Sequence, residues 1–179
     1  PKGSVYRANL RQPNIGMFVK YTFSGEGTEV YMPRFTFFGY RYISLTATDD
    51  VEIERITSIP VTSVTKEMEI GKVQTGVKDL NRFIANVYWG QLSNYLSVPT
   101  DCPQRDERLG WTGDAQIFLR TAAYNYDVRR FFYKWLRDMA AAQRDNGGIP
   151  VVIPDMVGGG DYFAAAWSDA VAIIPWELY

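Results

Sequence analysis

The chain has 179 residues, 46% hydrophobic and 22% charged, a composition that excludes intrinsic disorder and low-complexity scaffolds. Its formal net charge of −1 provides no global field for nucleic acid or a membrane, so we expect neither as a partner. Histidine is absent and Cys102 is the single cysteine, which excludes Ser-His and Cys-His nucleophiles, the usual zinc ligand sets and an internal disulfide; we expect neither metal nor cofactor.

The first third of the chain has the composition of β-strands. Three segments rich in Val, Ile, Thr, Phe and Tyr are separated by Gly or Asp turns: residues 17–24, 35–48 and 51–64. Alternate residues of the first segment fall on opposite faces, with Val19, Tyr21 and Phe23 on one of them. This alternation predicts half-buried antiparallel strands.

Beyond Lys66 the apolar period becomes helical, so we expect a division into residues 1–66 and 67–179. Apolar residues three and four positions apart predict four helices, over residues 77–92, 114–124, 127–143 and 163–174. The first should carry an apolar stripe formed by Val77, Leu80, Ile84 and Val87.

The second helix should bury Ile117, Phe118 and Thr121. Asp127 is the expected N-cap of the third helix, and we expect the fourth helix to end before Pro175.

A long connection, residues 97–113, separates the first two expected helices. Helix connections of this length are uncommon unless they are functional, and four carboxylates lie in or beside it, on Asp101, Asp106, Glu107 and Asp114. Glycosidic cleavage needs a proton donor, carboxylates for sugar hydroxyls and an aromatic face, which Trp111 could provide. Such a cluster is also common as a solvated loop of exposed ion pairs, so the chemistry does not follow from the cluster alone.

The amino-acid sequence of this segment is more specific than its carboxylate content. Residues 98–116, VPTDCPQRDERLGWTGDAQ, resemble the signature of bacterial α-L-rhamnosidases of glycoside hydrolase family 78. The resemblance extends to further short motifs: residues 37–42 (FFGYRY), 88–91 (YWGQ), 134–138 (KWLRD), 148–150 (GIP), 167–170 (WSDA) and 174–176 (IPW). It implies an α+β fragment, in which the end of a β-sandwich domain precedes the first helices of an (α/α)6-barrel catalytic domain.

The resemblance also implies residue roles. Glu107 matches the general acid of the family, and Asp101 and Asp114 match carboxylates that bind rhamnose hydroxyls. Trp111 matches the aromatic residue beside that sugar. Two further substrate-binding positions are carried over from a second pocket motif, namely Trp167 and Asp169. Asp106, Arg105 and Arg108 are expected to be structural, with an arginine keeping a neighbouring carboxylate ionised.

The implied activity is hydrolysis of terminal α-L-rhamnosides with inversion, acting on a rhamnose-containing glycan or glycoside. No residue matches the family's general base, and only four helices of the barrel are expected, so we expect a fragment that needs the remainder of its own catalytic domain. Another (α/α)6-barrel glycosidase and a non-catalytic carbohydrate-binding or structural module remain as alternatives.

Several positions also have purely structural interpretations. Trp89 and Trp135 lie on apolar helix faces and are expected in the core, and Trp111 could join them. Cys102 is most simply a small buried residue. The triple glycine at residues 158–160 lacks the Lys-Ser/Thr of a phosphate-binding loop and is expected to be a flexible connection.

Overall fold

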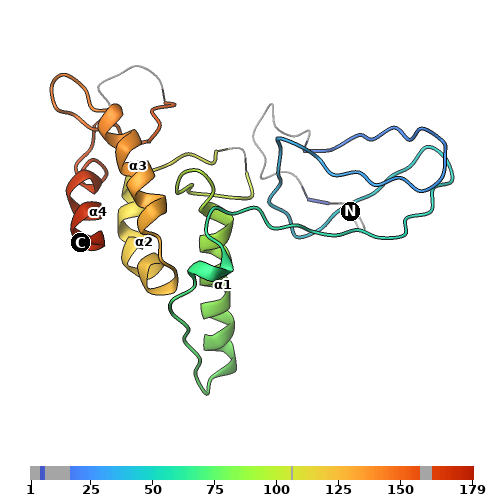
Figure 1. Ribbon diagram of the computed structural model, residues 1–179, viewed down its shortest axis with the longest axis horizontal. Coiled ribbons are helices and arrows are strands. Elements are labelled where there is room, and N and C mark those ends of the chain that lie inside the picture. Colours follow the sequence, from blue (N-terminus) through green and yellow to red (C-terminus); the bar gives the residue numbers. More distant parts are fainter. Residues whose placement is uncertain (1–4, 7–16, 106, 158–162) are drawn as a thin grey trace. The chain divides into compact units, whose positions relative to one another are not determined.

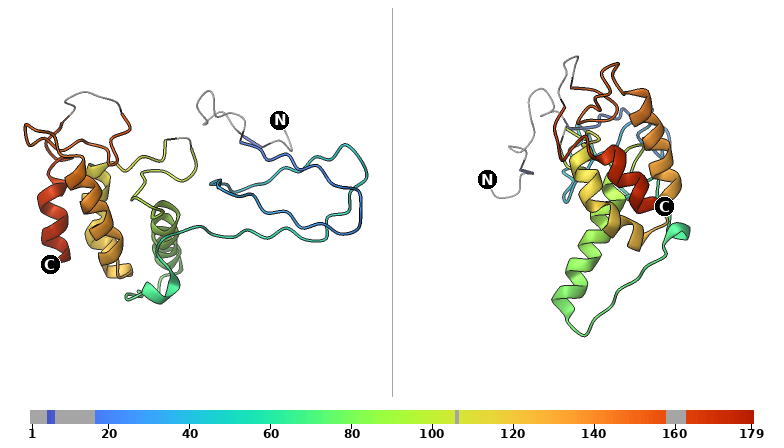
Figure 2. Two further views of the ribbon diagram at one scale, coloured as in Figure 1. Left: turned by 45° about the horizontal axis from the view of Figure 1, so that its top comes forward. Right: turned by 90° about the vertical axis from the view of Figure 1, so that its left-hand side faces the viewer.

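The computed structural model describes residues 5–6, 17–105, 107–157 and 163–179. The chain forms two compact units, residues 1–59 with 103–106 and residues 60–102 with 107–179. The second unit contains every helix of the described residues, and α2, α3 and α4 lie side by side in it (Figures 1 and 2).

The expected strands do not form. Residues 17–62 are fully described and contain extended segments and bends but no strand. Local contacts join neighbouring segments, as where the rings of Tyr21 and Tyr31 stack at 4.4 Å. Apolar side chains of the expected inner face are exposed, among them Val19 at 42% and Phe23 at 49%. A hairpin gains its stability from a further strand or a second layer over its apolar face, and these segments have neither in this unit.

Three predicted helices are confirmed with shifted ends. They are α1 (Lys78–Asn94), α2 (Thr112–Asn125) and α3 (Arg129–Ala141), preceded by the short 3-10 helix η2 (Lys66–Met68). Val128 is the N-cap residue of α3, while the Asp127 Oδ1 atom accepts the Arg129 N–H at 3.3 Å. The predicted N-cap is therefore wrong by one residue, and Asp127 supports the helix start from the position before the cap.

The fourth helix, α4 (Ala170–Leu178), is displaced from its prediction and passes through Pro175. Ala170 and Ile174 are both fully buried, so packing fixes the helix from its first turn. The Tyr179 N–H donates to the Pro175 carbonyl at 3.1 Å, which continues the backbone pattern beyond the proline. The break expected at Pro175 is therefore wrong, because tertiary contacts outweigh the lost hydrogen bond.

The core lies where α2, α3, α4 and residues 149–153 meet. Its fully buried members are Leu119, Ala122, Phe132, Trp135, Met139, Ile153, Ala170 and Ile174. The predicted inner face of α2 is wrong in part: Ile117 is 82% exposed and Thr121 is exposed, whereas Phe118 packs partly against the core. The buried face of α2 is formed instead by residues that include Ala115, Leu119 and Ala122.

Helix α1 contributes one fully buried side chain, that of Gln91. Its Nε2 donates to the Ala122 carbonyl at 3.2 Å, and its Oε1 accepts from Asn125 Nδ2 at 2.9 Å. Val77 and Leu80, at the start of the predicted stripe, are 59% and 44% exposed. A buried amide pair thus connects α1 to α2, because both polar ends of Gln91 find partners.

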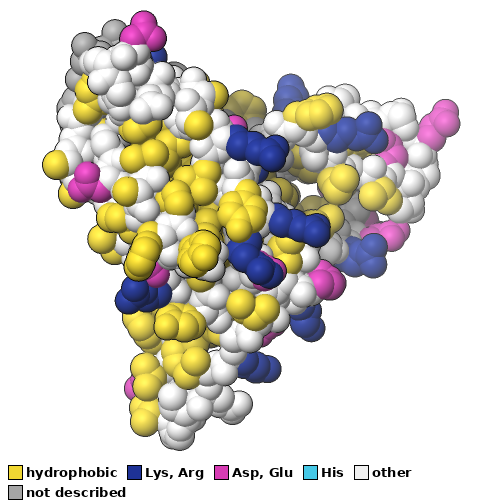
Figure 3. Space-filling view, turned by 60° about the vertical axis from the view of Figure 1, so that its left-hand side comes forward, with side chains coloured by type: hydrophobic (Ala, Val, Ile, Leu, Met, Phe, Trp, Pro, Cys, Tyr) yellow, Lys and Arg dark blue, Asp and Glu magenta, His cyan; other side chains and the backbone are white. Residues whose placement is uncertain are grey.

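Large apolar side chains also remain on the surface of the helical unit. Figure 3 turns the α4 side forward and shows hydrophobic side chains gathered there; Trp176 is 78% exposed. Arg120 of α2 forms a two-pronged ion pair with Glu177 of α4, at 2.9 Å and 2.7 Å. None of the helices in the described part is both long and apolar enough to cross a membrane.

Candidate active site

The loop after α1 folds back on itself and brings two of its carboxylates together. The Asp101 N–H donates to the Leu109 carbonyl at 3.1 Å, and the Leu109 N–H donates to Asp101 Oδ1 at 3.0 Å. The Arg108 N–H donates to Cys102 Sγ at 3.3 Å, with Arg108 in the left-handed region at φ 51°. This reversal sets the side chain of the preceding residue, Glu107, beside Asp101.

Glu107 is the centre of the resulting cluster. One carboxylate oxygen of Glu107, one of Asp101 and Cys102 Sγ all lie within 4.8 Å of one another. The indole Nε1–H of Trp111 donates to Glu107 Oε1 at 3.1 Å, which orients the carboxylate along the loop. The three clustered atoms could share a cation, but no other observation on the described residues points to one.

The end of the loop is anchored to the core. The Ile153 N–H donates to the Gly110 carbonyl at 2.9 Å, and the N–H and Oγ1 of Thr112 both donate to the Val151 carbonyl. Trp135 of α3, fully buried, donates its Nε1–H to the Ile153 carbonyl at 3.0 Å. A Cβ at Gly110 would lie 2.2 Å from that carbonyl oxygen, so this approach requires glycine.

Asp114 lies in the first turn of α2, on the exposed side of the helix. Partial burial raises the pKa of its carboxyl, and repulsion from the charges of Asp101 and Glu107 raises it further. The Asp114 carboxyl therefore accepts a proton more readily than an isolated aspartate would, because two further carboxylates lie within electrostatic range of it.

The second predicted motif lies against the same end of α2. Trp167 is 39% exposed, and its indole packs so closely on Gly113 that a Cβ there would lie 2.8 Å from the ring. Asp169 Oδ2 accepts the Ala166 N–H at 2.9 Å, and Asp169 is the N-cap residue of α4. Trp167 is thus held next to the helix turn that carries Asp114, which follows Gly113 directly.

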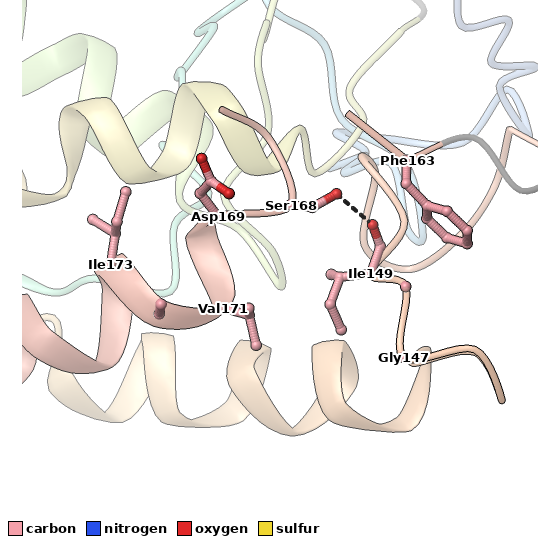
Figure 4. A pocket seen from close by; sticks show the side chains of 9 residues that line it. Gly147, Ile149, Phe163, Ser168, Asp169, Val171 and Ile173 are labelled. Carbon is pink, nitrogen blue, oxygen red and sulfur yellow. Dashed lines mark hydrogen bonds between the residues drawn. The ribbon is translucent and has the colours of Figure 1, made fainter. Parts of the chain in front are cut away.

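An open pocket of about 560 Å3 is lined by residues that include Gly148, Phe163, Ser168 and Asp169. Figure 4 shows Ser168 directed at the Ile149 carbonyl, to which its Oγ donates at 2.7 Å, and the Asp169 carboxylate pointing away from Val171. Asp101, Glu107, Trp111, Asp114 and Trp167 do not line this pocket. The predicted site residues therefore do not share one cavity.

Some of the structural interpretations of single residues are confirmed and one is wrong. Trp135 and Cys102 are buried as expected, whereas Trp89 is 59% exposed and its assignment to the core is wrong. The reason is that α1 packs on α2 through Gln91, two positions along, which turns Trp89 outward. Trp111 is half-buried and hydrogen-bonded to Glu107, so it belongs to the site. Asp106 and residues 158–160 lie outside the described residues.

Sequence reasoning missed two residues of this region. Gly113 allows the close approach of Trp167, and a glycine inside a helical turn, which costs stability relative to alanine, was the available signal. Gln116, 7% exposed, donates its Nε2–H to the Ala166 carbonyl. Nothing in the sequence around Gln116 indicates a partner 50 residues away, so only the fold reveals this contact.

Two family models match the chain. The bacterial alpha-L-rhamnosidase 6 hairpin glycosidase domain matches residues 68–179, and the bacterial alpha-L-rhamnosidase concanavalin-like domain matches residues 1–62. Among curated proteins, alpha-L-rhamnosidases of Streptomyces avermitilis and Formosa agariphila are 43% and 39% identical over 100% of this chain. The chain spans only 17% and 19% of their respective lengths.

Solved structures agree with these matches. The chain resembles the crystal structure of Streptomyces avermitilis alpha-L-rhamnosidase complexed with L-rhamnose, with 44% identity and a TM-score of 0.59, over 66% of this chain and 11% of that one. It also resembles the native alfa-L-rhamnosidase of Aspergillus terreus, with 40% identity and a TM-score of 0.60, over 63% of this chain and 13% of that one.

Proposed function

Because the chain belongs to the bacterial alpha-L-rhamnosidase family, we propose that it is part of a glycoside hydrolase that cleaves terminal α-L-rhamnosides with inversion of configuration. In this proposal residues 1–66 belong to the end of a β-sandwich domain, although their described part contains no strand, and residues 67–179 are the first helices of an (α/α)6 barrel. The substrate is a rhamnose-containing glycan or glycoside, and the remainder of the catalytic domain completes the site.

The observation that carries the proposal is the convergence of Asp101, Glu107 and Asp114 at the N-terminal end of α2. Glu107 is the general acid: it gives its proton to the glycosidic oxygen as the carbon–oxygen bond breaks and its electron pair moves to that oxygen. Asp101 and Asp114 hold sugar hydroxyls, and Trp111 provides the apolar face while its N–H orients Glu107.

The water that attacks the anomeric carbon must lose its proton to a base. An inverting pair stands roughly 6.5–9.5 Å apart to admit that water. A carboxylate oxygen of Asp101 lies within 4.8 Å of one of Glu107, which leaves too little room for the attacking water. Asp101 Oδ1 also accepts the Leu109 N–H, so Asp101 does not fit the role of general base. We therefore place the general base outside residues 1–179, in the larger part of the enzyme.

The decisive test uses the full-length enzyme and p-nitrophenyl α-L-rhamnoside. Glu107→Gln should lower kcat about 10²- to 10⁴-fold while rhamnose binding, measured by calorimetry, persists. Glu177→Gln is the matched control, because Glu177 pairs with Arg120 on the surface and should turn over like the wild type. Unchanged turnover in Glu107→Gln would remove this residue as the acid.

The stereochemistry has its own readout. NMR of the first-formed sugar should show the inverted anomer. Retention would instead assign the close Asp101–Glu107 pair as nucleophile and acid, since retaining carboxyls stand only about 5–5.5 Å apart. A panel of aryl glycosides tests the sugar: faster cleavage of a glycoside other than rhamnoside would refute the substrate assignment.

A further inference from the structure

Trp167 is held in an unusual turn. The Trp167 N–H donates to the Ala164 carbonyl at 3.2 Å, which closes a four-residue turn with Ala166 at its third position. Ala166 has φ 66°, the left-handed conformation that normally requires glycine or asparagine there. A non-glycine residue persists in that conformation only where surrounding contacts impose it.

Two side chains impose it, one on each side of Ala166. Asp169 Oδ2 accepts the Ala166 N–H at 2.9 Å, and the Gln116 Nε2–H donates to the Ala166 carbonyl. Gln116 lies on α2 with 7% of its surface exposed, one turn after Gly113. Since Gly113 is the residue on which the Trp167 indole packs, α2 fixes both the backbone and the ring of this turn.

We propose that Gln116 and Asp169 are positioning residues that clamp the Ala166 backbone and thereby hold Trp167 as a wall of the sugar subsite. The assignment rests on the proposed function for the role of Trp167, and it changes the role of Asp169 from substrate ligand to clamp. The Asp169 oxygen used by the clamp accepts a backbone N–H of the turn that precedes α4.

The geometry also explains why an amide is needed at position 116. The Gln116 Oε1 atom is buried and accepts no hydrogen bond from the described residues, so the side chain keeps an unpartnered acceptor. An amide with only its N–H₂ end satisfied is a costly choice for a buried site. The amide of Gln116 compensates by donating a hydrogen bond to the Ala166 carbonyl, which an apolar side chain of the same length cannot do.

The first experiment measures kinetics on p-nitrophenyl α-L-rhamnoside with the full-length enzyme. Gln116→Met keeps the volume and removes the donor, and it should raise KM about 3- to 10-fold with little change in kcat, because a displaced aromatic wall weakens ground-state and transition-state binding alike. In a Trp167→Ala background the same substitution should have no further effect on KM. An equal effect in both backgrounds, or an unchanged KM, would overturn the clamp.

Two sets of control variants separate positioning from stability and from direct binding. Gln91→Met also removes a buried Nε2–H bonded to a backbone carbonyl, but it lies on α1 and should lower stability without raising KM. Asp169→Asn keeps an oxygen for the Ala166 N–H and should retain the wild-type KM, whereas Asp169→Ala should match Trp167→Ala. A raised KM in Asp169→Asn would restore Asp169 as a substrate ligand. Asp169→Ala also tests the clamp if Gln116→Met does not fold.

A second readout is independent of activity. In protein labelled with 5-fluorotryptophan, the Trp167 ¹⁹F resonance is assigned by its loss in Trp167→Phe. Gln116→Met should shift or split that resonance and leave the Trp135 resonance in place, since Trp135 is buried on α3. If the wild type shows no rhamnosidase activity, the proposed function fails while this spectrum still decides the clamp. An unchanged Trp167 resonance would refute it.

Discussion

Trp135 connects the helical core to the candidate site, so its replacement tests how the site is supported. It is fully buried, and its Nε1–H donates to the Ile153 carbonyl, whose own residue is fully buried and bonded to Gly110. Trp135→Phe keeps an aromatic ring there but removes the donor. We expect the segment that anchors the loop to lose its tie to α3.

The expected loss in the free energy of unfolding of Trp135→Phe has two parts. A buried carbonyl left without a partner costs about 1–3 kcal/mol. The ring atoms removed leave a void, which at roughly 24 cal/mol per Å3 adds about 1 kcal/mol. The free energy of unfolding should therefore fall by about 2–4 kcal/mol in total.

Urea unfolding of residues 1–179, followed by circular dichroism at the helical band, measures this loss, because every described helix lies in the unit that contains Trp135. With a slope of about 2 kcal/mol per molar, the midpoint should fall by about 1–2 M. Trp89→Phe is the matched control, since that tryptophan is 59% exposed and should change stability by less than about 0.5 kcal/mol. Equal midpoints for the two variants would refute the support that we assign to Trp135.

Three further predictions follow from the same geometry. Gly110→Ala should destabilise the loop and lower activity of the full-length enzyme, because its Cβ would lie 2.2 Å from the Ile153 oxygen; wild-type melting and turnover would contradict this. Two hydrogen bonds from the Arg129 side chain hold the pKa of Asp127 at about 2, so the pair stabilises the fold above pH 4 and is lost as the pH falls toward 2. Asp127→Asn should therefore cost under about 1 kcal/mol at neutral pH, this exposed pair being screened, and its unfolding curve should approach that of the wild type at pH 2; a constant gap would refute the linkage. Residues 1–179 alone should hydrolyse p-nitrophenyl α-L-rhamnoside at least about 10²-fold more slowly than the full-length enzyme, and comparable turnover would mean that a base lies within them.

The closeness of the Asp101 and Glu107 carboxylates could be predicted from the sequence because it depends on one short loop. Asp101, Glu107, Trp111 and Asp114 lie within 14 residues, and the loop reversal at Arg108 needs no distant partner to bring the first two together. The helices α1, α2 and α3 were equally predictable, since an apolar period of 3.6 residues reports which backbone can bury one face. Which face of each helix is buried was less predictable: Ile117 and Trp89 were expected in the core but are exposed.

Tertiary packing decided everything that depends on which surfaces meet. Strand composition in residues 17–62 did not produce strands, because a strand also needs a neighbour to bond and a layer to cover it. Pro175 did not end α4, because Ala170 and Ile174 are buried against the other helices. The contact of Gln116 with Ala166 joins residues 50 positions apart, and no local pattern encodes it. Sequence spacing thus determined which carboxylates share the loop. Long-range packing determined which side chains contact the turn of Trp167, because the contact between Gln116 and Ala166 joins α2 to the segment before α4.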